Sequence, residues 1–232
     1  TDVLASYLRR AGVPDERIEV IHNGINEAHF ATAPGNPEAK ARLGLSGQTV
    51  LGFTGFVRSW HGLDKIIRWM ATAGHENVHL LVVGEGPARP ELEALSQELG
   101  IAARVTFTGL VHRDRVPEHV AAFDVALQPA VVEYASPLKL FEYLALGRAV
   151  VAPRVPNLME ILVDTENALL FDPATPGALE AVLERLSADA DLRERLGQAA
   201  RNSIQQRGFT WRGNAQRITR LFETCLATQG RA

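Results

Sequence analysis

The chain has 232 residues, of which 46% are hydrophobic and 22% charged, so it can bury a full core without a metal or disulfide staple. Its formal net charge of -3 at pH 7 and its pI near 6.2 exclude a general attraction for nucleic acid, and any anionic ligand needs a local site. The single cysteine, Cys225, cannot form an internal disulfide and is interpreted as a packed thiol, which fits a reducing, cytoplasmic location. No run approaches about 20 uninterrupted apolar residues and no signal-peptide pattern opens the chain, so a membrane span is not expected.

The first 47 residues predict a helix, a short strand and a surface connection. The helix spans residues 2–11 and ends at Gly12. The strand spans residues 18–21 and is stopped by Asn23-Gly24. Residues 33–47 are rich in Pro, Gly and Asn around one basic helical turn, which is typical of a connection on the surface.

The middle of the chain alternates apolar, β-branched runs with amphipathic stretches, the pattern of a parallel sheet covered by helices on both faces. The predicted strands span residues 49–55, 79–83, 105–108, 125–128, 149–152 and 168–171. The predicted helices between them span residues 63–73, 90–99, 113–122 and 137–146. Right-handed crossovers bring the carboxyl ends of such strands to one edge of the sheet, where ligands bind. The fold class is therefore α/β and Rossmann-like.

From residue 176 onward the chain is almost continuously helical, with Gly208 as a break before a last helix over residues 211–226. This helix is longer than the covering of one sheet requires. The sequence shows no internal repeat and no low-complexity tract.

A glycine-bearing loop leads from the first predicted strand into the first helix of the sheet. Gly55 opens the loop, and Arg58 and His61 add side-chain donors to the free N–H groups of a helix start, which together suit a phosphate. A plain strand-to-helix turn with an exposed Arg explains the loop equally well. The loop is neither a Walker sequence nor a GxGxxG fingerprint.

Two further glycine motifs close the second and third strands. Gly84 and Gly86 flank an acidic residue before a Pro. This pattern favours a tight turn over a ligand contact, because Gly-Pro commonly forms a turn before a helix. The segment Gly109-Leu110-Val111 has the same ambiguity but falls on the ligand edge.

The stretch from residue 133 to residue 147 carries the most information about a site. Ser136 is predicted as the N-cap and Pro137 as the first residue of a helix, so the N–H groups of Leu138 and Lys139 would point at the sheet edge beside the Lys139 ammonium, an arrangement that suits a diphosphate. Glu142 follows in the second turn, where a carboxylate can accept hydrogen bonds from ribose or sugar hydroxyls. A solvated Glu142 paired with Lys139 at the i, i+3 spacing is an equal alternative.

Taken together, the motifs resemble the large family of retaining GT-B glycosyltransferases of the group 1 or family 4 type, which includes sucrose-synthase-like, lipopolysaccharide and mannosyl transferases. The resemblance covers nearly the whole chain in five ordered segments, at residues 21–26, 84–87, 104–109, 141–152 and 209–211. It implies that residues 1–232 are the C-terminal, nucleotide-sugar-binding domain, with a core over about residues 20–205 and a C-terminal helix over residues 209–228.

The resemblance also implies roles for individual residues. Glu142 binds the ribose hydroxyls, and the backbone at Leu110 and Val111 meets the base. The backbone of residues 136–139 holds the diphosphate, and Glu133 touches the donor sugar. The family's paired glutamates are usually eight residues apart, whereas Glu133 and Glu142 are nine apart, with Tyr134 at the usual position.

The first loop departs from the family's usual Gly-Arg and Lys-Gly pairs. Arg58 and His61 replace that Arg and Lys here, and His61 would have to be protonated to substitute fully for a lysine. A third departure is Asn167-Ala168, where the family usually has Asn-Gly. We expect Arg58, His61, Lys139 and the helix start to form a clamp for the leaving diphosphate, with no metal and no cofactor.

The expected activity is transfer of a hexose from a UDP or GDP sugar with retention of configuration. The chain begins without Met, and we expect an N-terminal acceptor domain to be absent from it. The fragment alone should therefore be inactive. Membrane contact should involve only that absent domain or the acceptor. One alternative is a degenerate, non-catalytic nucleotide-binding or interaction domain. Another is a Rossmann-type dehydrogenase or related enzyme, disfavoured by the missing GxGxxG.

Overall fold

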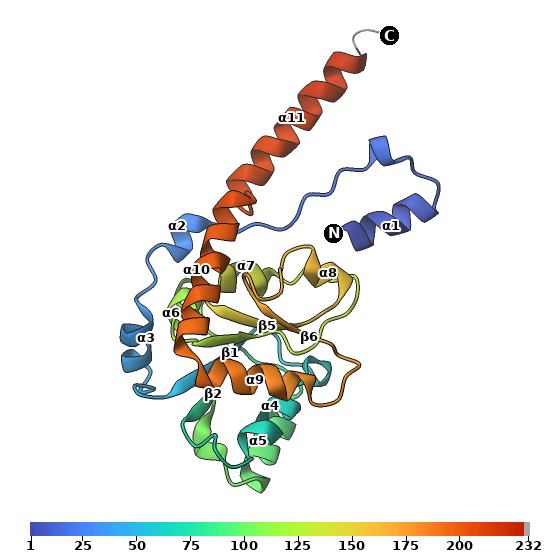
Figure 1. Cartoon of the computed structure of the whole chain (residues 1–232). Coiled ribbons are helices and arrows are strands. Elements are labelled where there is room, and N and C mark those ends of the chain that lie inside the picture. Colours follow the sequence, from blue (N-terminus) through green and yellow to red (C-terminus); the bar gives the residue numbers. More distant parts are fainter. Residues whose placement is uncertain (230–232) are drawn as a thin grey trace.

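A computed structural model describes residues 1–229, and its centre is a six-stranded parallel sheet in the order β3-β2-β1-β4-β5-β6 (Figure 1). The strands are β1 (Thr49–Thr54), β2 (Val78–Val83), β3 (Val105–Phe107), β4 (Val125–Leu127), β5 (Ala149–Pro153) and β6 (Leu169–Phe171). Helices cover both faces, which confirms the predicted Rossmann-like α/β class.

The predicted helices are present with bounds that differ by a few residues, and the last one extends past its predicted end at residue 226. Two short helices, Glu27–Phe30 and Pro156–Met159, were not predicted. The helices are α1 (Asp2–Arg10), α2 (Glu27–Phe30), α3 (Asn36–Arg42), α4 (Leu63–Met70), α5 (Arg89–Glu98), α6 (Val116–Ala121), α7 (Leu138–Ala145), α8 (Pro156–Met159), α9 (Ala178–Ala188), α10 (Ala190–Gln206) and α11 (Trp211–Gln229). Four short 3-10 helices lie between them: η1 (Asp15–Arg17), η2 (Ser59–His61), η3 (Ala102–Arg104) and η4 (Arg113–Arg115). No helix in the described part of the chain combines the length and the apolar character that crossing a membrane needs.

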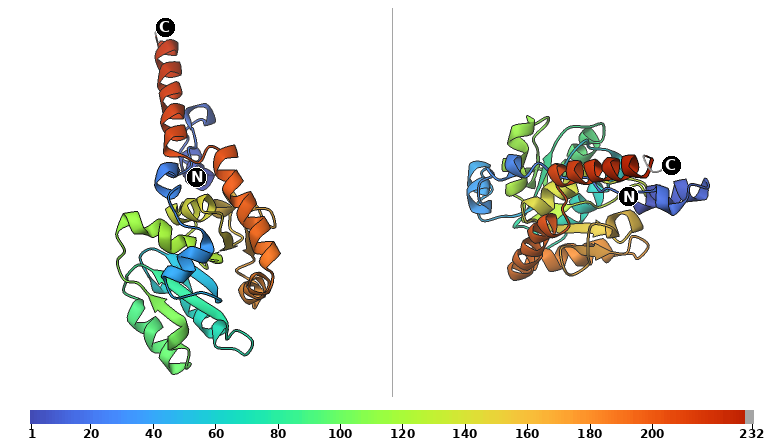
Figure 2. Two further views of the ribbon diagram at one scale, coloured as in Figure 1. Left: turned by 90° about the vertical axis from the view of Figure 1, so that its left-hand side faces the viewer. Right: turned by 90° about the horizontal axis from the view of Figure 1, so that it is seen from above.

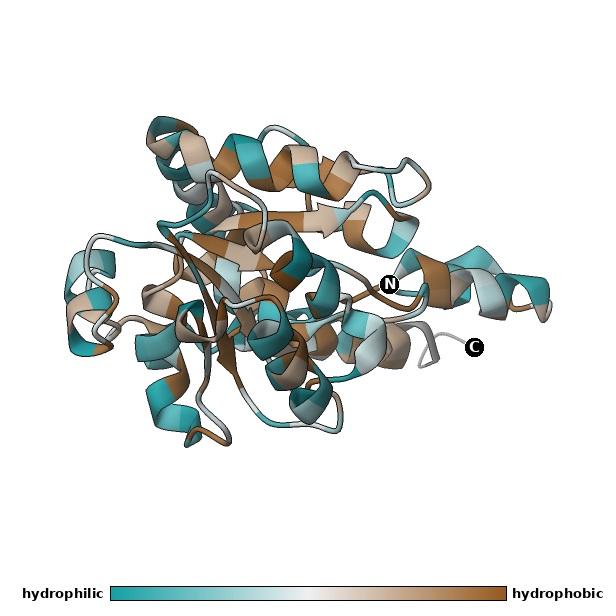
Figure 3. Cartoon of the chain, turned by 90° about the horizontal axis from the view of Figure 1, so that it is seen from below, coloured by the Kyte–Doolittle hydropathy of each residue, from teal (hydrophilic) through white to brown (hydrophobic). Residues whose placement is uncertain are grey.

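The sheet buries a separate apolar cluster on each face. Within β1, Val50 packs into the cluster beside α6 and α7, whereas Leu51 and Phe53 pack into the cluster beside α4 and α5. This alternation follows from the two-residue period of a strand. Figure 3 shows the result as apolar strands between helices whose outer faces are hydrophilic.

The predicted strand over residues 18–21 is wrong. These residues form no strand, because no neighbouring strand in the described part of the chain offers them a hydrogen-bonding partner. The first bridge in this region joins Ile25 to Thr210.

Two motifs from opposite ends of the sequence meet at that bridge. The N–H of Ile25 donates to the carbonyl of Phe209 (3.0 Å), and the N–H of Trp211 donates to the carbonyl of Ile25 (3.2 Å). A Cβ on Gly24 would lie 2.6 Å from the carbonyl carbon of Thr210, so only glycine allows this approach. The Asn-Gly turn and the start of α11 therefore pack directly against each other.

Helix α11 extends away from the sheet and its covering helices (Figures 1 and 2). Its apolar side chains Ile218, Phe222 and Leu226 are exposed. The thiol of Cys225 on the same helix is also exposed, so the interpretation of a packed thiol is wrong.

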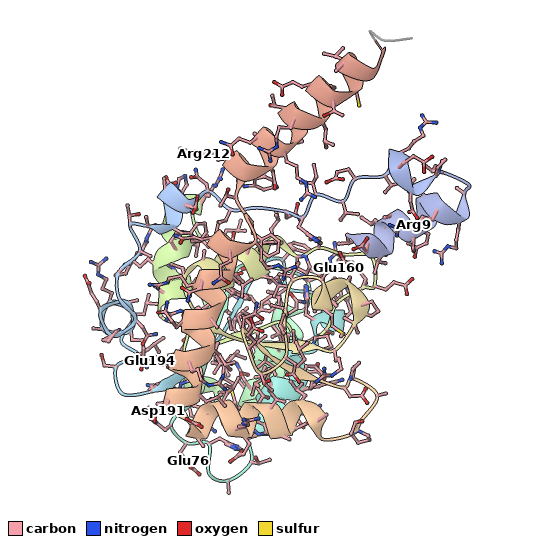
Figure 4. The ribbon with its side chains drawn as sticks, turned by 45° about the horizontal axis from the view of Figure 1, so that its top comes forward. Arg9, Glu76, Glu160, Asp191, Glu194 and Arg212 are labelled. Carbon is pink, nitrogen blue, oxygen red and sulfur yellow. The ribbon has the colours of Figure 1, made fainter. Side chains whose placement is uncertain are left out.

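Helix α1 lies against α8 rather than against the sheet. The carboxylate of Glu160, labelled in Figure 4 below the start of α1, accepts hydrogen bonds from the N–H groups of Asp2 (2.8 Å) and Val3 (3.1 Å). A carboxylate at a helix N-terminus offsets the positive end of the helix dipole. This contact fixes α1 near the carboxyl edge of the sheet.

The glycines of residues 84–87 are explained by close packing. A Cβ on Gly84 would lie 2.1 Å from the carbonyl oxygen of Gly55, and one on Gly86 would lie 2.2 Å from that of Val57. The N–H of Val57 donates to the carbonyl of Glu85 (2.9 Å) across the same contact. The loops after β1 and β2 thus support each other directly, in line with the turn interpretation.

We expect Gly84→Ala to destabilise the domain by about 2–4 kcal/mol, because the new methyl adds overpacking to the strain of a positive φ. Gly74→Ala is the matched control, since Gly74 also has a positive φ (94° against 140°) but its Cβ would meet nothing within 4 Å. The control should cost about 1–2 kcal/mol, the strain alone. Urea denaturation gives both values, and equal losses would contradict the packing argument.

Candidate functional site

A cleft of about 470 Å³ opens at the carboxyl ends of β1 and β2, beside the start of α7. The register explains its position, because Thr54 pairs with Val83 and the two following loops leave the sheet at the same level. The predicted site residues that line the cleft are Gly55, Gly84, Leu110, Val111, Leu138, Lys139 and Glu142.

Lys139 is half-buried and places its ammonium group in this cleft. Its Nζ lies 3.7 Å from the centroid of the Phe53 ring, and a Cβ on Gly55 would lie 3.4 Å from that Nζ. Within the described residues no carboxylate lies within 4.0 Å of it. Burial lowers the pKa of Lys139 to about 7, against a weaker opposing effect of Glu142. An unpaired, half-buried cation of this kind favours an anionic ligand.

Glu142 faces the same cleft one helical turn further on. Burial raises the pKa of its carboxyl group, while Lys139, His29 and Arg113 oppose that shift. Among the described residues it makes no ion pair within 4.0 Å, so the alternative of a surface pair with Lys139 is not supported. Its oxygens are available to hydroxyl donors in the cleft.

His61 is buried against the ring of Phe53 (ring centroids 4.8 Å apart) and does not line the cleft. Its Nδ1 accepts a hydrogen bond from the N–H of Arg58 (3.1 Å), which leaves the ring proton on Nε2. Burial lowers the pKa of His61 to about 4, and the charges of Lys139 and Arg58 act in the same direction. In the unliganded protein His61 therefore offers an N–H donor but carries no charge. It does not fully replace a lysine, because that would require a protonated ring.

Arg58 lies at the rim. Its guanidinium carbon is 4.9 Å from the centroid of the exposed Phe56 ring, and the residue is the N-cap of η2. Arg58 does not line the cleft. The structure thus groups Lys139 and His61, with Arg58 on the exposed loop beside them.

The predicted start of α7 is displaced by one residue. Pro137, not Ser136, is the N-cap, with an extended backbone (φ -66°, ψ 118°), and the helix begins at Leu138. Ser136 Oγ is buried and finds no hydrogen-bond partner in the described part of the chain. The N–H groups of Leu138 and Lys139 still precede the first bonded turn, as the diphosphate hypothesis requires.

Two asparagines hold the chain before α7 in this extended form. Asn23 Nδ2 donates to the carbonyl of Ser136 (3.0 Å), and Asn157 Nδ2 donates to the carbonyls of Val132 (3.2 Å) and Ala135 (2.7 Å). Asn157 is fully buried. Its role was not predicted, because a single Asn between apolar residues carries no sequence signal.

Comparison with known proteins shows the family to which the chain belongs. Residues 36–203 match the family model "Glycosyl transferases group 1". The chain belongs to this glycosyltransferase family. Membership favours a transferase over the Rossmann-type dehydrogenase considered from the sequence.

Relatives and solved structures agree with this membership. An uncharacterized glycosyltransferase of Methanocaldococcus jannaschii is 26% identical over 94% of this chain and 57% of its own length. The 2-deoxystreptamine glucosyltransferase of Streptomyces kanamyceticus is 31% identical over 81% of the chain and 49% of its own length. Sucrose-phosphate synthase of Thermosynechococcus elongatus superposes with a TM-score of 0.82 at 26% identity, over 98% of this chain and 57% of that one. The chain spans about half the length of the curated relatives it matches.

Two further residues of the predicted site, Glu133 and Gly86, do not line the cleft. Glu133 sits in an exposed turn, where its Oε1 accepts a hydrogen bond from the hydroxyl of Tyr7 on α1 (3.2 Å). Gly86 packs against Val57. Within the described residues no group of three or more His, Cys, Asp or Glu side chains is placed to hold a metal ion.

Proposed function

We propose that this glycosyltransferase domain binds the diphosphate of a nucleoside-diphosphate hexose, and that the hexose leaves with retention of its anomeric configuration. The observation that carries the proposal is the half-buried Lys139 ammonium, which lines the cleft at the start of α7 one turn from Glu142 and has no ion-pair partner among the described residues. HepE of Anabaena supports a UDP donor by analogy, since it has been solved with UDP and superposes with a TM-score of 0.83 at 22% identity, over 94% of this chain and 61% of that one.

The chemistry follows from where charge develops. As the bond from the anomeric carbon to the diphosphate oxygen lengthens, the sugar becomes oxocarbenium-like and the leaving oxygens gain negative charge. The Lys139 ammonium, the His61 Nε2–H and the free N–H groups of Leu138 and Lys139 stabilise those oxygens more in the transition state than in the ground state. Arg58 can add charge from the rim, and the donors need no metal ion to act.

The acceptor is proposed to bind a part of the protein outside these 232 residues. The chain covers about half of its relatives, and the exposed apolar residues of α11 and α1 offer a surface for that part. The domain alone is then expected to bind nucleotide and to transfer no sugar.

We expect the 232-residue chain to bind UDP or GDP in calorimetry, and Glu142→Ala to weaken that binding about 10-fold or more, because a charged acceptor for the ribose hydroxyls is lost. Glu98→Ala, which removes an exposed carboxylate from the end of α5, is the matched control and should change nothing. No binding of UDP, GDP or ADP at millimolar concentration would overturn the proposal.

A degenerate, non-catalytic binding domain is the second candidate. The uncharged His61 and the outlying Glu133 favour it, because His61 lacks the charge expected in the diphosphate clamp and Glu133 lies outside the cleft where the donor sugar would contact it. Nucleotide binding that depends on Glu142 without sugar transfer in the longest natural form of the protein would support this candidate over the first.

A further inference from the structure

Two arginines lie side by side at the amino edge of the sheet, opposite the edge that holds the cleft. Arg148 directly precedes β5, and Arg201 lies on α10. Both side chains donate to the carbonyl oxygen of Leu146 at the end of α7, Arg148 from Nε (2.8 Å) and Arg201 from Nη2 (3.3 Å). Burial and the charge of Arg201 lower the pKa of Arg148 to about 10, so the two like charges repel each other.

Close packing of α10 against the turn after α7 holds the two arginines together. A Cβ on Gly197 would lie 2.2 Å from the carbonyl oxygen of Gly147, so only glycine lets α10 approach this turn. A Cβ on Gly147 would in turn lie 3.3 Å from Nε of Arg201, which places the Arg201 side chain over the backbone beside Arg148. The two charges therefore cannot move apart by a shift of the backbone without loss of this packing.

Carbonyl groups use only part of the donor capacity of the arginine pair. Arg148 Nη1 donates to the carbonyls of Ala121 (3.1 Å) and Phe123 (3.0 Å). Arg148 Nη2 and the Nε and Nη1 of Arg201 make no hydrogen bond within the part of the chain that the structure describes. In the same part, no carboxylate lies within 4.0 Å of either guanidinium. Each guanidinium carries five N–H donors, so both donors and charge remain for a ligand.

Two cavities of about 500 Å³ each adjoin at the arginine pair, because Arg148 and Arg201 line both of them. Phe30, Leu146 and Ile204 give the first cavity apolar walls. The second cavity is mostly polar. A ligand that enters the first cavity therefore meets an apolar wall and the two guanidinium groups together.

The nearby carboxylates do not cancel the positive charge of the arginine pair. Asp124 lines the second cavity, but its Oδ2 already accepts a hydrogen bond from Lys40 Nζ (2.8 Å). Glu27 lines the first cavity and Glu194 the second; both are exposed, and neither makes an ion pair within 4.0 Å among the described residues. Arg193 lines the second cavity as well and adds a further guanidinium. An excess of positive charge therefore remains at this edge of the sheet.

We propose that the arginine pair is a second anion site, which binds a small organic phosphate with its phosphate group on Arg148 and Arg201 and its apolar part in the first cavity. A phosphate group carries close to two negative charges and several acceptor oxygens, so it can pair with two adjacent guanidinium groups at once and offset their repulsion. The apolar walls at Phe30 and Ile204 favour an ester with an apolar group over free phosphate, because apolar surface leaves water on binding.

The test uses the chain with Lys139→Met, because that change removes the ammonium that would bind a phosphate in the cleft. We expect calorimetry on this variant to show one site for phenyl phosphate, with an affinity about 10-fold or more above that for inorganic phosphate. Adding Arg201→Ala should weaken both ligands about 10-fold or more, because a charged hydrogen-bond donor is lost. Arg201 is the residue to change, since it makes a single hydrogen bond of 3.3 Å to the protein, whereas Arg148 also holds the carbonyls before β4.

Arg68→Ala is the matched control, since it removes an exposed arginine on α4 that lines neither cavity, and it should change neither affinity. Melting curves without ligand should show every variant folded. No binding of phenyl phosphate at millimolar concentration, or equal binding with and without Arg201→Ala, would overturn the site. Inorganic phosphate that binds as tightly as phenyl phosphate would identify a site for free phosphate and overturn the organic ligand. The proposed function would stand in each case, because it depends on the opposite edge of the sheet.

Discussion

Lys139→Ala is expected to lower the rate of sugar transfer about 100-fold or more, in whichever form of the protein transfers sugar. The ammonium is the one charged donor that lines the cleft in the described part of the chain, and His61 beside it is neutral. Removing it leaves the charge that develops on the leaving oxygens to backbone N–H groups and a neutral imidazole. The turnover number measured at saturating donor reports this loss.

One further variant separates the charge of Lys139 from its volume, and a second variant is a control. Lys139→Met keeps an unbranched side chain over the Phe53 ring and should lose as much rate as Lys139→Ala. Lys65→Ala removes an exposed lysine from α4 that does not line the cleft, and it should leave the rate within about 2-fold. A normal rate in both Lys139 variants would refute a leaving-group role.

The sheet was largely predictable because its inner strands β1, β2, β4 and β5 are buried on both faces. Continuous apolar, β-branched runs such as 49–54 and 78–83 are typical of strands covered by helices on both faces, so composition alone predicts these two strands. Residues 18–21 show the same local composition, but a strand also needs a neighbour to pair with, and periodicity cannot supply one.

The position of the site was predictable, and its protonation states were not. A parallel sheet brings the loops after β1, β2 and β3 to one edge, so Gly55, Gly84 and Leu110 had to converge there. The neutral state of His61 depends on burial and on the charge of Lys139, which lies 78 positions away in the sequence. Such a contact exists only once the fold is formed.

The affinity for a nucleoside-diphosphate sugar is expected to fall as the pH rises above about 7. In the unliganded protein the pKa of Lys139 is lowered to about 7, so the ammonium loses its proton above that pH. A bound diphosphate raises that pKa, and the complex therefore holds more protons than its components. The affinity should fall by up to about 10-fold per pH unit, or about 50-fold between pH 7 and pH 9. Calorimetry across this range, in buffers of different ionisation enthalpy, measures both the affinity and the proton uptake.

The same shift has the opposite sign for folding, which separates it from a general loss of structure at alkaline pH. Between the lowered pKa near 7 and the ordinary value of 10.5, the unfolded chain binds more protons at Lys139 than the folded domain, so this group makes the unliganded domain more stable as the pH rises. Lys139→Met removes both dependences, because it has no proton to lose. A sugar-nucleotide affinity that stays flat from about pH 7 to 9 while the unchanged chain remains folded would show that the Lys139 ammonium does not meet the diphosphate.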